Sequence, residues 1–121
     1  MKVMSYKELE AYRKSYEVVK KVYEITISFP KEEIYSLTTQ IRRSSISIPS
    51  NIAEGYMRGS KEYIQFIKIA LGSAAELETQ LSLSKDLGFC DDRSFNEVFM
   101  LNQEVIKLLK TYIKKLTISN R

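Results

Sequence analysis

The sequence predicts an all-α protein, an antiparallel up-down-up-down four-helix bundle. Apolar residues recur every three or four positions in four long segments, the spacing of an amphipathic helix. The 121 residues include only 4 Gly and 2 Pro, too few for a turn-rich β protein, and their number suits one domain. Breaks of a few residues make successive helices antiparallel. We therefore expect a single domain over 1–121, with helices at about 5–28, 31–57, 60–88 and 92–117.

The first helix is expected to start at a capping box, in which Ser5 and Glu8 satisfy free backbone N–H groups. It should end at Phe29-Pro30, because a residue that precedes proline is pushed out of helical geometry. Its apolar stripe is Leu9, Tyr12, Tyr16, Val19, Tyr23 and Ile27.

The second helix opens with acidic residues, which suit the positive end of the helix dipole. Pro49 lies inside its apolar pattern and should kink it, since proline removes one backbone hydrogen bond. The stripe keeps its phase across Pro49, which indicates one kinked helix ending at Gly55 or Gly59. The stripe comprises Ile34, Leu37, Ile41, Ile48 and Ile52.

The third helix should begin at Ser60 as N-cap and stop at Leu87-Gly88-Phe89. Small residues at 72–75 would let a neighbouring helix approach closely. Its stripe is Tyr63, Phe66, Ile67, Ala70, Ala74, Leu77 and Leu81.

The fourth helix has candidate caps in Asp91, Asp92 and Ser94, and Ser94 with Glu97 repeats the capping-box spacing. Its stripe is Phe95, Val98, Leu101, Val105, Leu108, Tyr112 and Leu116.

Apolar residues beside these stripes predict oligomerisation, because large exposed apolar patches usually mark partner surfaces. Val18 and Val22 lie beside the first stripe, and Ile106 and Leu109 beside the fourth. Changing Ile106 or Leu109 to Lys is expected to yield a smaller species.

Composition excludes several kinds of site. With no His and one Cys, the chain cannot build a Cys/His zinc site, a His-based triad or an intramolecular disulfide. We expect no cofactor, no metal and no enzymatic activity. The N-terminus has no apolar signal-peptide core, and no apolar run approaches the roughly 20 residues of a membrane span. A cytoplasmic protein without a membrane partner is the expectation.

A polar block at 40–55 reads QIRRSSISIPSNIAEG, and GSAAELETQL follows at 72–81. Together with the FPKEE segment at 29–33, these stretches closely resemble the 23S rRNA intervening-sequence protein family. The resemblance spans nearly the whole chain. It implies a left-handed four-helix bundle, a homopentamer, and kinship with accessory bundle proteins of diversity-generating retroelements. Those proteins are thought to bind nucleic acid and a reverse transcriptase through basic surfaces. No catalytic residues come with the resemblance.

The polar residues of these blocks have competing interpretations. Arg42 and Arg43 could contact phosphate or pair with glutamates inside the bundle, and we favour pairing for at least one. A carboxylate site for Mg²⁺ or Ca²⁺ is conceivable but disfavoured, because Glu76 and Glu78 cannot face one direction on a helix. The structural polar signature comprises Gln40, Arg42, Arg43, Ser47, Pro49, Asn51, Glu54, Gly55, Glu76 and Glu78.

The net charge of +4 permits nucleic-acid binding without requiring it. From Val105 onward the chain carries no acid, and Lys107, Lys110 and Lys114 share one helical face. A phosphate-binding stripe and a plain solvated face are both consistent with this pattern. The candidate nucleic-acid-binding residues are Lys14, Lys20, Lys21, Arg58, Lys107, Lys110, Lys114 and Lys115.

Eight tyrosines are present, and at heptad spacing they are expected to pack in the core or an interface, with base stacking as the alternative. The first functional hypothesis is a non-enzymatic oligomeric bundle that binds RNA or DNA, or docks a nucleic-acid enzyme. The second is a homo-oligomeric scaffold without a nucleic-acid role. The third, an enzyme, would require Arg42, Glu54 and Glu76 to converge in a pocket.

Overall fold

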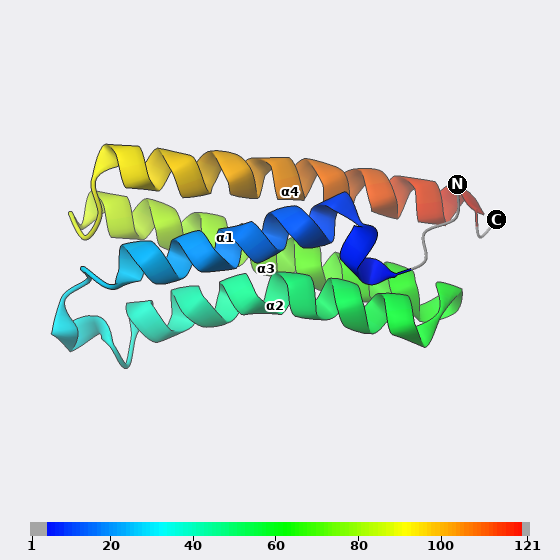
Figure 1. Cartoon of the computed structure of the whole chain (residues 1–121), viewed down its shortest axis with the longest axis horizontal. Coiled ribbons are helices and arrows are strands. Elements are labelled where there is room, and N and C mark those ends of the chain that lie inside the picture. Colours follow the sequence, from blue (N-terminus) through cyan, green and yellow to red (C-terminus); the bar gives the residue numbers. More distant parts are fainter. Residues whose placement is uncertain (1–4, 120–121) are drawn as a thin grey trace.

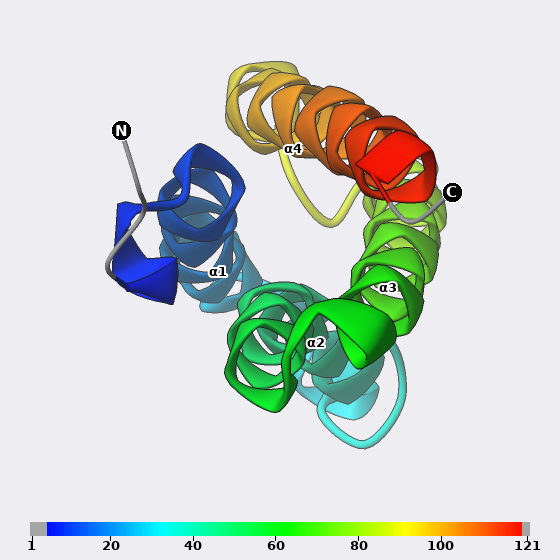
Figure 2. The same ribbon diagram turned by 90° about the vertical axis from the view of Figure 1, so that its right-hand side faces the viewer.

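The protein is a four-helix bundle, seen here in a computed structural model that describes residues 5–119 (Figure 1). Those residues contain four long helices and no strand. Each helix packs against the next along the chain, and α1 also packs against α4 (Figure 2). The helices are α1 (Glu10–Thr26), α2 (Leu37–Arg58), α3 (Ser60–Asp86) and α4 (Asp92–Ser119), and 3-10 turns lie at η1 (Tyr6–Glu8) and η2 (Lys31–Glu33).

Helices α1 and α2 begin later than the sequence predicts. The Ser5 hydroxyl accepts a hydrogen bond from the Lys7 N–H at 3.2 Å and caps η1 rather than an α-helix. The backbone of Leu9 is then extended, so α1 starts at Glu10. Likewise η2 and a turn occupy 31–36, and α2 starts at Leu37. These segments form isolated 3-10 turns and do not extend α1 or α2. Starting an α-helix fixes several residues for only one hydrogen bond, so a short segment gains little by becoming α-helical.

The two glycines near the end of α2 have different roles. Gly59 has a φ of 106° and separates α2 from α3, a conformation that glycine adopts without steric cost. Gly55 is buried inside α2, where a Cβ would lie 2.5 Å from the Cβ of Phe66. Gly55 therefore permits close packing of α3 instead of ending the helix. Pro49 lies inside α2 and is buried.

The apolar face of α1 differs from the predicted one. Ala11, Val18 and Val22 are fully buried, whereas Tyr16 is 52% exposed and Ile27 is 80% exposed. The prediction for this face was wrong because α1 carries two apolar rows with the same spacing. The row of smaller residues fits the space near the bundle axis, and the tyrosine row is left at the surface.

The predicted stripes of α3 and α4 contribute most of the remaining core, with one error. Leu109 is fully buried, and Ile106 packs against the core, so neither is an outer surface residue as expected. The exposed apolar side chains of these helices are Ile69, Leu83, Met100 and Ile118. Among residues 5–119, no helix combines the length and apolar character needed to cross a membrane.

Candidate nucleic-acid interface

The candidate basic residues fall into two groups in the structure. In the first group, each cation has an acidic partner, and two of these pairs join α1 to α4. The ammonium of Lys14 lies 3.2 Å from the carboxylate of Glu104, and that of Lys21 lies 3.8 Å from Glu97. In both pairs the lysine is partly buried and the glutamate is exposed, so the pairs contribute little stability, but they neutralise the positive charge locally.

Lys20 and Arg58 also belong to the paired group. Lys20 lies 3.3 Å from Glu17 on the same helix. The Arg58 guanidinium pairs with Glu54 at 2.8 Å and Glu62 at 3.1 Å, and these partners raise its pKa further above the usual value. A phosphate would have to displace these carboxylates.

The second group consists of the four lysines of the second half of α4. Lys107, Lys110, Lys114 and Lys115 are exposed, and none has an ion pair among residues 5–119. The acids Glu97 and Glu104 lie earlier in α4. The unpaired charge is consequently concentrated at one end of the helix.

Two lysines of α3 extend this basic end and were not among the predicted site residues. Lys61 and Lys68 are exposed, and the described part of the chain offers neither an ion pair. They stand seven residues apart and so share a face of α3. The first half of α3 lies alongside the second half of α4 (Figure 1). That seven-residue spacing was visible in the sequence. The sequence did not show that this part of α3 lies beside the lysines of α4.

The two adjacent arginines of the polar signature have separate environments. The Arg42 Nε donates a hydrogen bond to the Thr26 hydroxyl at 2.9 Å, and its guanidinium lies 4.7 Å from the centre of the Tyr23 ring. Arg42 therefore links α2 to the end of α1. Its partners are not the glutamates that the sequence suggested. Arg43 is exposed and has no ion pair within residues 5–119.

Ser47 of the signature joins α2 to Ser73 of α3. The Ser47 and Ser73 hydroxyls lie 2.8 Å apart, and the Asn51 amide donates to the Ser47 hydroxyl at 2.9 Å and to its carbonyl at 2.7 Å. A polar cleft of about 360 Å³ opens beside these contacts, and the buried Oε1 atom of Gln80, which lines it, has no hydrogen-bond partner among residues 5–119. The cleft is lined by Gln40, Arg43, Ser44, Ser47, Ser73, Glu76 and Gln80.

The glutamates of the signature are dispersed. Glu54 pairs with Arg58, and Glu78 accepts a hydrogen bond from the Gln103 amide at 2.8 Å. Glu76 lines the polar cleft. Residues 5–119 contain no group of three or more Cys, Asp or Glu side chains that could hold a metal ion. Neither Arg42 nor Glu54 lines the cleft that contains Glu76.

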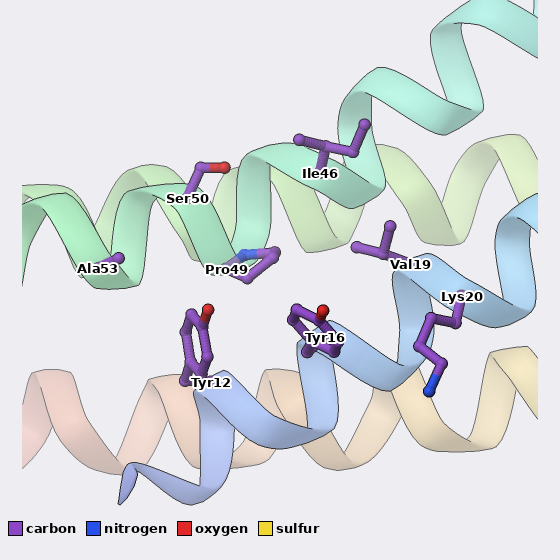
Figure 3. A pocket seen from close by; sticks show the side chains of 8 residues that line it. All are labelled: Tyr12, Tyr16, Val19, Lys20, Ile46, Pro49, Ser50 and Ala53. Atoms are coloured by element: carbon purple, nitrogen blue, oxygen red, sulfur yellow. The ribbon is translucent and has the colours of Figure 1, made fainter. Parts of the chain in front are cut away.

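A second hollow, which we call the α1–α2 groove, lies on the other side of α2 (Figure 3). The rings of Tyr12 and Tyr16 project from α1 toward Pro49 of α2, where Ala53 is too small to fill the space between the helices. The groove has a volume of about 380 Å³ and is lined by Tyr12, Tyr16, Val19, Lys20, Ile46, Pro49, Ser50 and Ala53.

The tyrosines of this groove belong to a longer aromatic row. The ring centres of Tyr12 and Tyr16 lie 6.1 Å apart, and Tyr12 meets Tyr6 at 5.0 Å. The row continues from Tyr6 to Tyr56 at 6.3 Å and from Tyr56 to Tyr63 at 6.1 Å. Burial, followed by neighbouring phenols, raises the pKa of Tyr12 and raises that of Tyr63 to about 12. These hydroxyls therefore stay neutral at physiological pH.

Cys90 lies between α3 and α4. Burial raises the pKa of its thiol, and the nearby Asp91 and Asp92 carboxylates raise it further. The thiolate, which is the reactive form, is correspondingly disfavoured.

Comparison with known proteins identifies relatives of this arrangement. Residues 7–111 match a family described as 23S rRNA-intervening sequence protein. A crystal structure of a protein with unknown function, from the S23 ribosomal protein family of Bacteroides thetaiotaomicron, superimposes with a TM-score of 0.76. The two sequences are 26% identical, and the match covers 86% of this chain and 98% of that chain. No curated protein matches the sequence.

Proposed function

The chain belongs to the 23S rRNA-intervening sequence protein family, and on that premise we propose that it is a non-enzymatic, oligomeric bundle protein that binds nucleic acid. The surface would be the basic end of the bundle, where RNA, DNA or a nucleic-acid enzyme could dock. The observation that carries the proposal is the set of exposed, unpaired lysines on α4, at positions 107, 110, 114 and 115.

Unpaired lysines suit phosphate binding for an energetic reason. A free ammonium that meets a phosphate releases condensed counterions from the nucleic acid, and this release drives association. A lysine already held by a carboxylate must first lose that partner. We therefore assign the phosphate contacts to α4, with Lys61 and Lys68 of α3 beside them, and remove Lys14, Lys20, Lys21 and Arg58 from the primary site.

The test is a charge reversal with a charge-matched control. In the test variant, Lys107, Lys110 and Lys114 are changed to Glu. In the control, Lys31, Lys85 and Arg93 at the opposite end of the bundle are changed to Glu. Binding of labelled RNA and DNA is measured by fluorescence anisotropy at several salt concentrations. The test variant should lose binding, whereas the control should retain it with the salt slope of the unmodified protein.

Equal binding by the two variants would show that the assigned face is wrong. A wild-type protein that binds no nucleic acid at low salt would remove the proposal itself. Each lysine that contacts a phosphate of a single strand should contribute about 0.7 to the slope of log K against log salt.

The alternative function is a homo-oligomeric scaffold without a nucleic-acid role. It is favoured by the outward face of α3, where Ile69 is 49% exposed and Leu83 is 48% exposed, with Gly72 and Ala75 between them. A pentamer is the assembly that the family resemblance implies. Ile69→Lys should reduce the mass measured by analytical ultracentrifugation if this face joins copies of the chain. An unchanged mass would exclude α3 as the interface.

The proposal also includes two finer features. The first is a left-handed up-down-up-down topology in which α2 has a kink at Pro49, and the position of this proline inside α2 supports the kink. The second is a cytoplasmic location, which a single free cysteine suits.

A further inference from the structure

On the basis of the nucleic-acid binding proposed above, we propose that the α1–α2 groove receives unpaired bases of a single-stranded nucleic acid. The lysines of α4 would hold phosphates, whereas the tyrosines of the groove would hold bases. The ligand class is thus a single strand of RNA or DNA. A duplex is excluded because its bases are paired and stacked inside the double helix and cannot reach the tyrosines.

The exposed aromatic surface is the first argument. Tyr16 is 52% exposed, and Tyr12 beside it is only partly buried. Their rings stand 6.1 Å apart with 39° between their planes, over a hollow of about 380 Å³ that is mainly apolar. Proteins that bind single strands use aromatic side chains in this way, because every base has a π-face that stacks on a ring.

The shape of the groove follows from the residues of α2. Pro49 and Ala53 face the tyrosines and present no polar side chain, so the side chains on the floor of the groove are apolar. Ser50 supplies a hydroxyl at the edge. A flat, apolar base therefore fits the groove better than a charged group does.

The charge around the tyrosines is the second argument. A neighbouring hollow of about 490 Å³ shares Tyr12 and Tyr16 with the groove and is lined also by Lys7, Arg13 and Glu17. Lys7 is exposed, and the Arg13 guanidinium donates to the Glu8 carbonyl at 2.6 Å. The Lys20 ammonium lies 3.3 Å from the Glu17 carboxylate and is neutralised by it, so Lys7 and Arg13 supply the net positive charge around the rings. This arrangement complements a strand whose phosphates lie at the rim and whose bases point inward.

The aromatic row gives the strand a path beyond the groove. From Tyr16 and Tyr12 it continues through Tyr6 to Tyr56, near the end of α2, and Tyr63, near the start of α3.

The experiment compares a strand with and without bases. The probes are fluorescein-labelled oligo(U), oligo(dT) and an abasic oligodeoxynucleotide, each of about 15 nucleotides, which is near the upper site size of common single-strand modules. Tyr16→Leu keeps an apolar side chain but removes the ring. Tyr16→Phe keeps the ring, and Tyr35→Leu removes a ring that is 94% exposed and outside the groove.

We expect Tyr16→Leu to weaken binding of oligo(U) and oligo(dT) by about 5- to 150-fold, the range for one stacked base. Its affinity for the abasic strand and its salt slope should stay unchanged. Tyr16→Phe and Tyr35→Leu should bind like the unmodified protein. Thermal unfolding by circular dichroism verifies that each variant is folded.

Three results would overturn the inference. If Tyr16→Leu binds all probes normally while the Lys107, Lys110 and Lys114 reversal abolishes binding, nucleic-acid binding stands but the groove has no part in it. If Tyr16→Leu changes the sedimenting mass and not the affinity, the groove joins copies of the chain. If the unmodified protein binds no probe, the proposed function itself fails.

Discussion

The two sides of α2 differ in how closely the neighbouring helix approaches. Toward α3, a Cβ on Gly55 would lie 2.5 Å from that of Phe66, and the Ser47 and Ser73 hydroxyls touch at 2.8 Å. Toward α1, large tyrosine rings face Ala53 across a hollow of about 380 Å³. Small residues on both helices give a closed contact. Large residues opposite small ones leave a groove that a ligand can fill.

The largest expected change in stability comes from adding a methyl group at the close contact between α2 and α3. Gly55→Ala should lower the free energy of unfolding by about 2 kcal/mol, because the added methyl group pushes against a Cβ fixed to the backbone of α3. Gly72→Ala is the matched control. Apart from the local helix backbone, no atom of residues 5–119 lies within 4 Å of a Cβ at that position, so Gly72→Ala should stabilise the helix by about 0.5–1 kcal/mol. Urea unfolding measures both, and effects of the same sign would refute the close contact.

The next effect concerns the polar link between α1 and α2. Arg42→Ala should cost about 1.5 kcal/mol, since it removes a charge-assisted hydrogen bond to Thr26 and the contact with the Tyr23 ring. Arg43→Ala, one residue along the helix, should change stability by less than about 0.5 kcal/mol. Unfolding of the two variants in denaturant makes the comparison. Similar losses would mean that the two arginines share one role.

A smaller change in stability is expected at the start of α4, which lies outside both contacts of α2. The Ser94 N–H donates to the Asp91 carboxylate at 2.7 Å, and this bond, with the Ser94 hydroxyl, lowers the Asp91 pKa. The carboxylate therefore stabilises the fold above its unfolded pKa of about 4, and this contribution is lost as the pH falls through the lower folded value.

Asp91→Ala should accordingly lower the thermal midpoint at pH 7, and the difference from the unmodified protein should narrow below about pH 4. A difference that persists unchanged in acid would show that the carboxylate charge is not the cause. Thermal melts monitored across this pH range provide the measurement.

The smallest effect is expected in the groove. Ala53→Leu adds volume to open space, so it should change the free energy of unfolding by less than about 0.5 kcal/mol. If bases occupy the groove, the same change should weaken binding of a single strand. A large loss of stability would show instead that α1 and α2 are already closely packed at this point.

The sequence by itself determined the helical class, the four segments and the family. The spacing of apolar residues, Phe29-Pro30 and Gly59 act locally, so their consequences can be read along the chain. The family resemblance rested on the polar block around Pro49, and the match over residues 7–111 confirms it.

Only the tertiary structure decided which surfaces are free. Two rows of α1 have the same spacing, and the volume available at the bundle axis selected Val18 and Val22 over the tyrosines. Lys14 is neutralised by Glu104, which is 90 residues away in the sequence, whereas the lysines at the end of α4 have no ion pair within residues 5–119. Pairing and burial depend on neighbours from other helices, and periodicity along one helix carries no information about them.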